Sequence, residues 1–349
     1  HFDYHSIDHN LLKLDILGHD DPTMIRMLEN LVPGVSAREI PLDSPEVMSL
    51  FMNTEALGIT PEDISGCQLG ALGIPEFGTD FAMQMLIDAQ PRYFSDLVRI
   101  AGLAHGTDVW LGNAQTLIKV GTATIRTAIC TRDDIMIYLI QKGMEPSLAF
   151  DIMEKVRKGK GLKPEWEEAM RQHDVPQWYI DSCNKIKYMF PKAHAAAYVM
   201  MAWRIAWYKI HYPLAYYAAF FSIRVSGFSY ELMCLGQDKL KYHLADYRAR
   251  MDSLSQKEQA TLRDMRIVEE MYARGFEFMP IDLYRAKARD FQIIDGKIMP
   301  ALNSIEGLGD KAAEAIVEAA KDGAFLSLED FYQRTKVSRT IIDLMGQMG

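Results

Sequence analysis

The sequence predicts a mainly α protein with a short β segment at its N-terminus and a small α+β region at its C-terminus. Prolines follow Ser, Thr or Asp at several positions, and Pro suits the first turn of a helix there. The segments after these prolines carry apolar residues at helical spacing. Strand patterns occur at residues 10–17 and 276–299, so we expect few strands.

Length and composition suit a soluble protein of two or three domains. The chain has 349 residues, of which 49% are hydrophobic and 24% are charged. Its four cysteines form no Cys-x-x-Cys pair, which indicates neither a zinc site nor a disulfide framework and suits a reducing cytoplasm. The most apolar stretch, residues 193–202, is soon followed by Arg204 and Lys209, so we expect no membrane span. The chain shows no signal peptide and does not begin with Met, so we expect a piece of a longer protein.

Charge is unevenly distributed along the chain. The formal net charge of −9 argues against a general polyanion-binding surface. Between residues 151 and 224, however, Lys and Arg outnumber Asp and Glu by twelve to seven, and no acidic residue occurs between Asp181 and Glu231. A local basic cleft that binds nucleic acid therefore remains compatible with the composition.

Residues 10–17 alternate as a strand does. Lys13 and Asp15 share one face, where a carboxylate and a lysine side by side can hold a divalent metal and a triphosphate. From the spacing alone, a solvated strand face is the more common explanation.

Most of the following segments are expected to be helical. Residues 66–78 hold several Gly and Pro and are expected to form a loop, while Asp295-Gly296 is a hairpin-turn signal. The expected helices are residues 21–31, 45–51, 61–64, 79–89, 93–102, one opening at Thr131, 146–157, 191–211, 213–224, further helices within 236–275, and two short ones within 325–346.

Residues 185–198 combine lysines, two tyrosines and a histidine with small alanines. Pro191 suits the first position of the helix, which places Lys192 and His194 in its first two turns. Lysines pair with phosphate, Tyr188 offers a ring for stacking, and alanines let a flat base approach the helix. The stretch indicates a nucleotide-binding helix; a core helix with a few snorkelling lysines is an equally good interpretation of these residues alone.

Arg132 stands at the start of an expected helix, where backbone N–H groups also attract anions. That position suits a triphosphate, and a surface salt bridge with Asp133 or Asp134 is the alternative.

Two further places carry groups suited to phosphate. In the basic turn at residues 157–161, glycines beside Lys158 and Lys160 let the backbone approach a polyphosphate, although it is not a Walker loop. His105 lies in a turn, where a histidine can contact a phosphate but more often has no specific partner.

Residues 302–316 are typical of a helix-hairpin-helix. Gly307 and Gly309 permit a tight turn, and the helix expected from about Asp310 aims free N–H groups at a phosphate. Such a motif binds duplex DNA without reading its sequence.

The run Tyr188-x-Phe-x-Lys192-x-His194-Ala-Ala-Ala-Tyr198 resembles the fingers motif of the bacterial replicative DNA polymerase III alpha subunit. Its sequence is similar to the PolC type rather than the DnaE type. Further PolC-like sequence occurs at residues 12–18, 73–78, 105–110 and 156–161, so the resemblance covers essentially the whole chain. It implies a helical fingers domain at residues 36–275, a short β palm edge at 1–35 and a helix-hairpin-helix region at 276–349.

The resemblance also implies roles for the candidate residues. Asp15 would be the third palm aspartate, a catalytic ligand of Mg²⁺, with Lys13 as a nearby cation. The other two aspartates of the family lie in an Asp-x-Asp motif that this chain lacks, so we expect the chain alone not to polymerise. The implied nucleotide-binding residues are Arg132, Tyr188, Lys192, His194 and Lys185, and the implied DNA-binding residues are His105, Lys158, Lys160, Gly307 and Gly309.

The expected partners are primer–template DNA, dNTPs and other replisome subunits, at the nucleoid in the cytoplasm. The family's clamp-binding tail is not seen in this sequence. A non-catalytic nucleic-acid-binding protein that uses only the helix-hairpin-helix is the alternative from another class.

Overall fold

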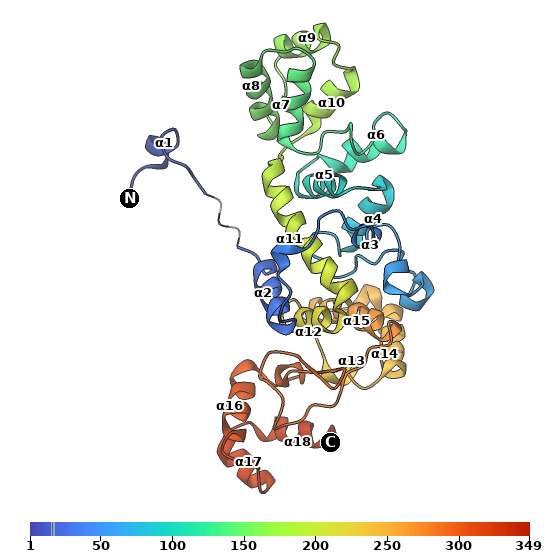
Figure 1. Ribbon diagram of the computed structural model, residues 1–349, viewed down its shortest axis with the longest axis vertical. Coiled ribbons are helices and arrows are strands. Elements are labelled where there is room, and N and C mark those ends of the chain that lie inside the picture. Colours follow the sequence, from blue (N-terminus) through green and yellow to red (C-terminus); the bar gives the residue numbers. More distant parts are fainter. Residues whose placement is uncertain (15, 17) are drawn as a thin grey trace.

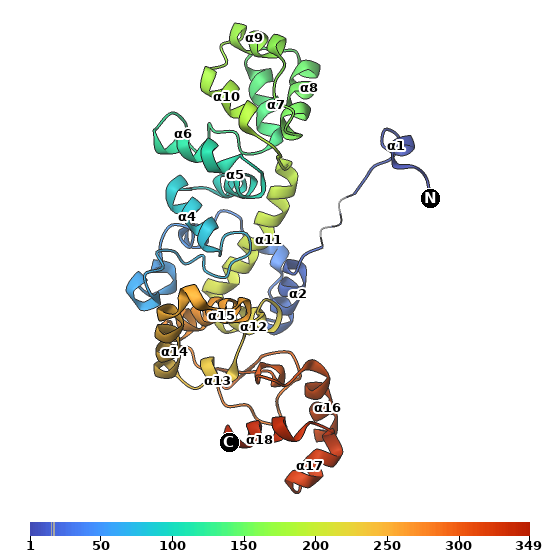
Figure 2. The same cartoon turned by 180° about the vertical axis from the view of Figure 1, so that it is seen from behind.

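Helix α11 (Lys192–His211) runs along the middle of an elongated molecule (Figures 1 and 2). The structure is a computed structural model that describes residues 1–14, 16 and 18–349. Pro191 is the N-cap of α11 rather than its first helical residue, so the helix begins one residue later than predicted, because the ψ of Pro191, 149°, is extended. The helix ends at His211 with Tyr212 as its C-cap, since Pro213 disfavours helical geometry in the residue before it.

Four helices pack around α11. They are α2 (Asp21–Leu31), α3 (Pro45–Ser49), α5 (Phe94–His105) and α12 (Pro213–Ile223). One face of α11 carries apolar residues at spacings of three and four, including Val199, Ala202 and Trp203, and these are buried. This face belongs to the large core of the protein.

A group of four helices forms one end of the molecule (Figure 1). It contains α7 (Arg132–Gln141), α8 (Pro146–Arg157), α9 (Pro164–Gln172) and α10 (Gln177–Lys185). The sequence analysis predicted α7 and α8 but not α9 and α10. The chain returns from α10 to the start of α11 through residues 186–191, which we call the connecting segment.

The remaining elements complete the middle and the opposite end. The middle contains the helices and short helical turns α4 (Asp80–Ala89), α6 (Gln115–Lys119), α13 (Tyr230–Met233), α14 (Gln237–Ala249), α15 (Gln256–Ala273), η1 (Ala37–Glu39), η2 (Glu55–Leu57), η3 (Pro61–Ile64), η4 (Trp110–Ala114) and η5 (Met251–Ser253). The opposite end contains η6 (Leu302–Ser304), α16 (Asp310–Ala320), α17 (Leu328–Thr335) and α18 (Arg339–Gln347). None of the described helices has the length and apolar character needed to cross a bilayer.

Strand structure is limited, as predicted, and the described residues of the chain hold a single two-stranded sheet. β1 (Gln292–Ile294) pairs antiparallel with β2 (Lys297–Met299), with Ile293 opposite Ile298. Asp295 and Gly296 both have positive φ, 50° and 74°, which matches the predicted two-residue hairpin turn. A second, smaller apolar core lies under this region and joins it to α16, α17 and α18.

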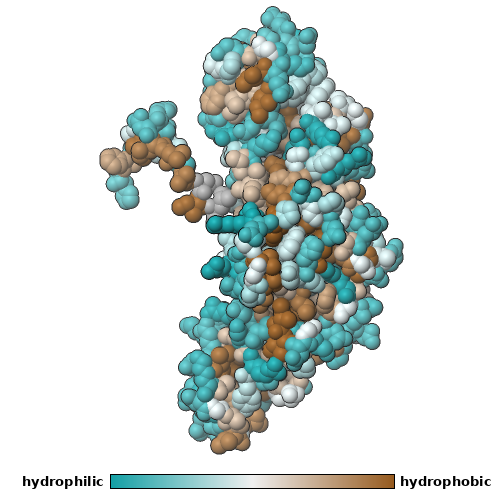
Figure 3. Space-filling view, viewed as in Figure 1, coloured by the Kyte–Doolittle hydropathy of each residue, from teal (hydrophilic) through white to brown (hydrophobic). Residues whose placement is uncertain are grey.

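The strand predicted over residues 10–17 is wrong for the described residues of that segment. After α1 (Tyr4–Ile7) the chain forms an arm that projects from the body, and Figure 3 shows apolar residues on its surface. Leu12, Leu14 and Ile16 are 86%, 75% and 92% exposed. A strand forms only where a neighbour satisfies its N–H and C=O groups, and the described part of the arm has no such pairing. Asp15 and Leu17 lie outside the described residues.

The ammonium group of Lys209 joins three parts of the fold. Lys209 is fully buried in α11, and its Nζ donates to the carbonyl oxygens of Gly70 at 2.8 Å and Leu72 at 2.7 Å. It also pairs with the carboxylate of Glu270 in α15 at 2.8 Å, and Tyr217 donates to the same carboxylate at 2.6 Å. Burial lowers the pKa of Lys209, and Glu270 opposes that shift. The loop at residues 66–78 is thereby fixed to α11 and α15.

We predict that Lys209→Met lowers the free energy of unfolding by about 3–5 kcal/mol, because it leaves the buried carboxylate of Glu270 without its partner. Urea unfolding followed by circular dichroism measures this loss. Adding Glu270→Gln should restore part of the stability, since the uncompensated charge is then removed. Lys297→Met, at a half-exposed ion pair, is the control and should have little effect. A double variant no more stable than the single one would contradict the explanation.

Candidate functional site

The connecting segment is held by backbone hydrogen bonds from three separate elements. Thr107, just after α5, forms an isolated β-bridge with Tyr188, and its N–H donates to the Tyr188 carbonyl at 2.9 Å. The Met189 N–H donates to the carbonyl of Arg157 at the end of α8, at 3.2 Å. The Arg132 N–H at the start of α7 donates to the Phe190 carbonyl, also at 3.2 Å. Main-chain hydrogen bonds, together with the buried side chains of Ile186 and Met189, therefore fix the position of the segment.

The N-termini of α7 and α11 meet at this segment. Asp133, in the first turn of α7, accepts a hydrogen bond from the Lys192 N–H at 2.7 Å. Lys192 is the first residue of α11, so Asp133 satisfies one of the free N–H groups of that helix. The contact brings Arg132 and Lys192, each the first residue of its helix, to the same place. Two helix N-termini and two cations together favour an anion.

A cluster of aromatic rings lies on the connecting segment and the first two turns of α11. The ring centroids of Tyr188 and Phe190 are 5.1 Å apart, and His194 lies 5.1 Å from Phe190 and 4.7 Å from Tyr198. His105, from the end of α5, lies 6.2 Å from His194. Tyr188 is 43% exposed, which leaves one ring of the cluster available for stacking.

His105 is fixed by Glu76 from the loop at residues 66–78. The two side chains form an ion pair, and the Glu76 side chain is only 7% exposed. The hydrogen bond that the His105 ring donates to Glu76 raises the pKa of His105 above its ordinary value, and partial burial opposes this rise. The loop that Lys209 holds therefore reaches the ring cluster through Glu76.

Beside this pair, His19, Asp21 and Glu76 place three possible metal-ligand atoms within 4.8 Å of one another. Asp21 is fully buried and already pairs with Arg224 at 3.1 Å, while Glu76 pairs with His105. Burial raises the pKa of Asp21, although His19 and Arg224 act in the opposite direction. Because each carboxylate has a basic partner, we interpret the cluster as a link between α2 and the loop.

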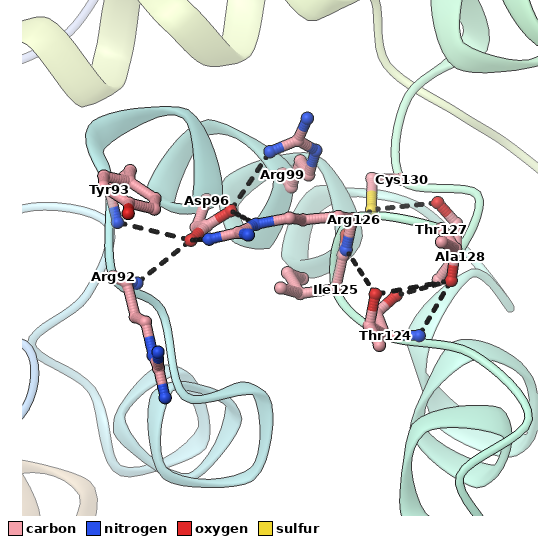
Figure 4. Close-up of polar contacts among 10 residues, drawn as sticks. All are labelled: Arg92, Tyr93, Asp96, Arg99, Thr124, Ile125, Arg126, Thr127, Ala128 and Cys130. Atoms are coloured by element: carbon pink, nitrogen blue, oxygen red, sulfur yellow. Dashed lines mark hydrogen bonds and ion pairs between the residues drawn. The ribbon is translucent and has the colours of Figure 1, made fainter.

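The loop that leads into α7 is fixed by Asp96 of α5 (Figure 4). The buried carboxylate of Asp96 accepts the N–H groups of Arg92 at 3.0 Å and Tyr93 at 3.3 Å. It also pairs with Arg99 at 3.1 Å and Arg126 at 3.4 Å. Burial raises the pKa of Asp96, but the hydrogen bonds from Arg92, Arg126 and Tyr93 outweigh it, so the pKa is lower than usual.

The predicted helix-hairpin-helix segment, residues 302–316, lies beside a cleft. Gly307 has φ +87°, and Gly309 is the N-cap of α16, as the sequence predicted for a helix-hairpin-helix. Both line a cleft of about 600 Å³ that also includes the start of α15. Lys257 of α15 pairs with Glu306 across this cleft at 2.9 Å.

The structure brings together five of the predicted site residues and separates others. Those at the meeting point of α5, α7 and α11 are Arg132, Tyr188, Lys192, His194 and His105. Lys158 lies at the end of α8, where its ammonium is 3.6 Å from Glu154, and Lys160 is exposed in the next turn.

The other predicted residues lie apart from that meeting point. Lys185 donates instead to the Gly112 carbonyl at 3.3 Å. Lys13 lies in the projecting arm, with its Nζ 5.4 Å from the Tyr4 ring centroid. Asp15 is outside the described residues.

Two acidic residues of the site were missed. Asp133 does not pair with Arg132, the alternative considered above, but caps α11, and no local pattern could reveal a partner 59 residues away. Arg132 instead lies 4.0 Å from Glu154 of α8. Glu154 stands three and four residues before Arg157 and Lys158 on a predicted helix, a spacing that does predict ion pairs.

Family models match two parts of the chain. Residues 21–174 match the bacterial DNA polymerase III alpha subunit finger domain, and residues 275–349 match the helix-hairpin-helix motif. Over the whole chain, DNA polymerase III PolC-type of Bacillus subtilis is 55% identical, that of Listeria monocytogenes 54% and that of Clostridium perfringens 53%. The chain belongs to the PolC-type DNA polymerase III family. It spans 24% of the length of each of these relatives.

This membership confirms the mainly α fold that the sequence predicted. The PolC-like motif at residues 188–198 lies between the two matched regions, at the start of α11. The finger model covers Arg132, His105 and Lys158, which share the surroundings of that motif. The contacts described above therefore connect the region that matches the finger model with the N-terminus of α11.

We predict that Asp133→Ala lowers the free energy of unfolding by about 1 kcal/mol, because α11 loses the acceptor at its first N–H. Asp133→Asn keeps an acceptor oxygen and should recover most of this loss. Asp151→Ala, at an exposed position of α8, is the control. Equal effects of Asp133→Ala and the control in urea unfolding would contradict a capping role.

We predict that the stabilising effect of Asp96 depends on pH. A carboxyl whose folded-state pKa is below its ordinary value of 3.8 stabilises the fold above that pH, and the effect is lost as the pH falls through the folded-state pKa. The difference in the free energy of unfolding between the native chain and Asp96→Asn should thus be largest above about pH 5 and narrow below about pH 4. Denaturant unfolding from pH 3 to pH 7 measures it, and a constant difference would refute this role.

Proposed function

We propose that this chain forms the nucleotide- and DNA-binding part of a replicative DNA-directed DNA polymerase. The full-length enzyme would add dNTPs to a primer 3′-hydroxyl by two-metal phosphoryl transfer, as the names of the relatives suggest. The observation that carries the proposal is the meeting of the α7 and α11 N-termini, which brings Arg132 and Lys192 to the end of the segment that carries the exposed Tyr188.

The proposed binding mode follows from the chemistry of that meeting point. A dNTP has a triphosphate and a flat base. Arg132, Lys192 and His194, together with the two helix N-termini, would hold the triphosphate. Tyr188 would stack on the nascent base pair, and the small Ala193 beside Lys192 leaves room for it. His105, oriented by Glu76, would lie next to His194 at this nucleotide site.

The proposal also includes a metal ion. Mg²⁺ would neutralise the phosphates and activate the primer 3′-hydroxyl, with Asp15 as one ligand. Asp15 lies outside the described residues, so this role rests on the resemblance of residues 12–18 to the family. Lys13 would approach the triphosphate only if the arm folded towards α11.

DNA binding would use two surfaces. The basic turn with Lys158 and Lys160 would contact template or primer phosphates beside the nucleotide. At the other end, the hairpin with Gly307 and Gly309 would hold the duplex by backbone N–H groups.

These surfaces correspond to the proposed division into a palm edge at residues 1–35, fingers at 36–275 and a duplex-binding region at 276–349. We propose other replisome subunits as partners and the nucleoid in the cytoplasm as the location.

The proposal predicts separate effects on dNTP and DNA. Lys192→Ala should weaken binding of a complementary dNTP by about tenfold or more, since a charge-assisted hydrogen bond is lost, and leave duplex binding nearly unchanged. Gly309→Ala should weaken duplex binding alone. Its backbone is not in the left-handed region and no atom lies within 4 Å of the added Cβ, so the variant should fold. Gly346→Ala, which is equally unhindered, is its control.

Fluorescence anisotropy on a primer–template, for this chain and for the full-length polymerase, measures both affinities across a salt titration. If duplex binding depends on Gly309 while Lys192→Ala and Tyr188→Ala leave dNTP affinity and base discrimination unchanged in the full-length enzyme, the nucleotide site is refuted. The non-catalytic DNA-binding alternative would then account for the hairpin.

A further inference from the structure

The carboxylate of Glu154 lies close to three cations at the edge of the proposed nucleotide site. Glu154 lies in the last turns of α8 and is about one quarter exposed, at 23%. Its two oxygens accept from Arg157 Nε at 2.7 Å and the Arg157 terminal nitrogen at 2.9 Å, a bidentate pair. Lys158 lies 3.6 Å away and Arg132 4.0 Å away. A single negative charge therefore faces three positive charges.

The guanidinium of Arg132 depends on this carboxylate for its orientation. Arg132 Nε is buried and has no hydrogen-bond partner, and the side chain as a whole is 33% exposed. At 4.0 Å, Glu154 attracts the guanidinium without making a tight bond to it. The N–H donors of the Arg132 guanidinium consequently stay available to an incoming anion, while Glu154 favours one orientation of that guanidinium.

Arg157 extends the influence of Glu154 to the connecting segment. The Arg157 carbonyl accepts the Met189 N–H, and its guanidinium is close enough to Tyr188 for the two to interact electrostatically. Because Glu154 fixes Arg157 in a bidentate pair, it supports the segment that carries Tyr188. Of the proposed nucleotide-binding residues, Arg132 thus lies next to Glu154, and Tyr188 is reached through Arg157.

We propose that Glu154 is a positioning residue for the incoming dNTP, which it serves by orienting Arg132. The inference rests on the proposed function of this site. Glu154 would not touch the nucleotide itself.

The direction in which Glu154→Gln changes the dNTP affinity separates a positioning role from a simple electrostatic effect. Glu154→Gln removes a negative charge near the triphosphate, so the change in field alone would tighten nucleotide binding. If Glu154 positions Arg132, the same change should instead weaken it, raising the Kd and KM for the complementary dNTP by about fivefold. We expect kcat to change less than KM and duplex affinity to stay the same.

The test compares four forms of the full-length polymerase: native, Glu154→Gln, Arg132→Ala and the double variant. If Glu154 acts through Arg132, Glu154→Gln should change the dNTP affinity by less than about twofold once Arg132 is absent. Glu167→Gln in α9 is the charge-matched control: its side chain is 26% exposed, and its ion pair is with Arg171 rather than with Arg132.

The possible results are distinguishable. If Arg132→Ala leaves dNTP affinity unchanged, the proposed nucleotide site fails. If Arg132→Ala weakens binding but Glu154→Gln leaves it unchanged or tightens it, or if the two effects add fully, the positioning role fails while the site stands. Should Glu154→Gln fail to fold, Glu154→Asp carries the test, because it keeps the charge and withdraws it by one methylene. A native-like dNTP affinity would then overturn the inference.

Discussion

The ammonium of Lys209 is the constraint on which the candidate site depends. A charge buried in the last turn of α11 is costly unless it is fully paired, and this one is paired by two carbonyl groups of a single loop and by Glu270. That loop carries Glu76, which holds His105 of α5 against the ring cluster. A contact at the end of α11 therefore helps to orient His105 beside the start of the same helix.

A second level of organisation is built on helix ends. α7 and α11 begin at one place because Asp133 supplies the acceptor that α11 lacks and because Arg132 and Phe190 share a backbone hydrogen bond. Two like-oriented helix dipoles would otherwise repel each other there. The carboxylate of Asp133 compensates part of that repulsion inside the protein, and the cations next to it remain partly exposed.

Much of this architecture could be predicted from the sequence, and the remainder could not for physical reasons. Proline positions and apolar spacing located α2, α8 and α12 closely, since these signals are local. The motif around Lys192 and His194 pointed to the site by family resemblance. Contacts such as Lys209 with Gly70, or Asp133 with Lys192, join residues more than fifty positions apart, and only the tertiary structure creates them. The strand expected at residues 10–17 is wrong for the described residues of that segment, because an alternating pattern cannot supply its own pairing partner.

The connecting segment has a consequence for how the site can change in evolution. Its place is set by main-chain hydrogen bonds to Thr107, Arg132 and Arg157. Gly159 approaches it so closely that an added Cβ would lie 2.4 Å from the Lys187 carbonyl oxygen. Exposed side chains such as those of Lys187 and Tyr188 are therefore free to mutate without moving the backbone that presents them. The side-chain chemistry that this segment presents can thus change by single substitutions at little cost in stability, whereas a side chain at Gly159 would push against the Lys187 main chain.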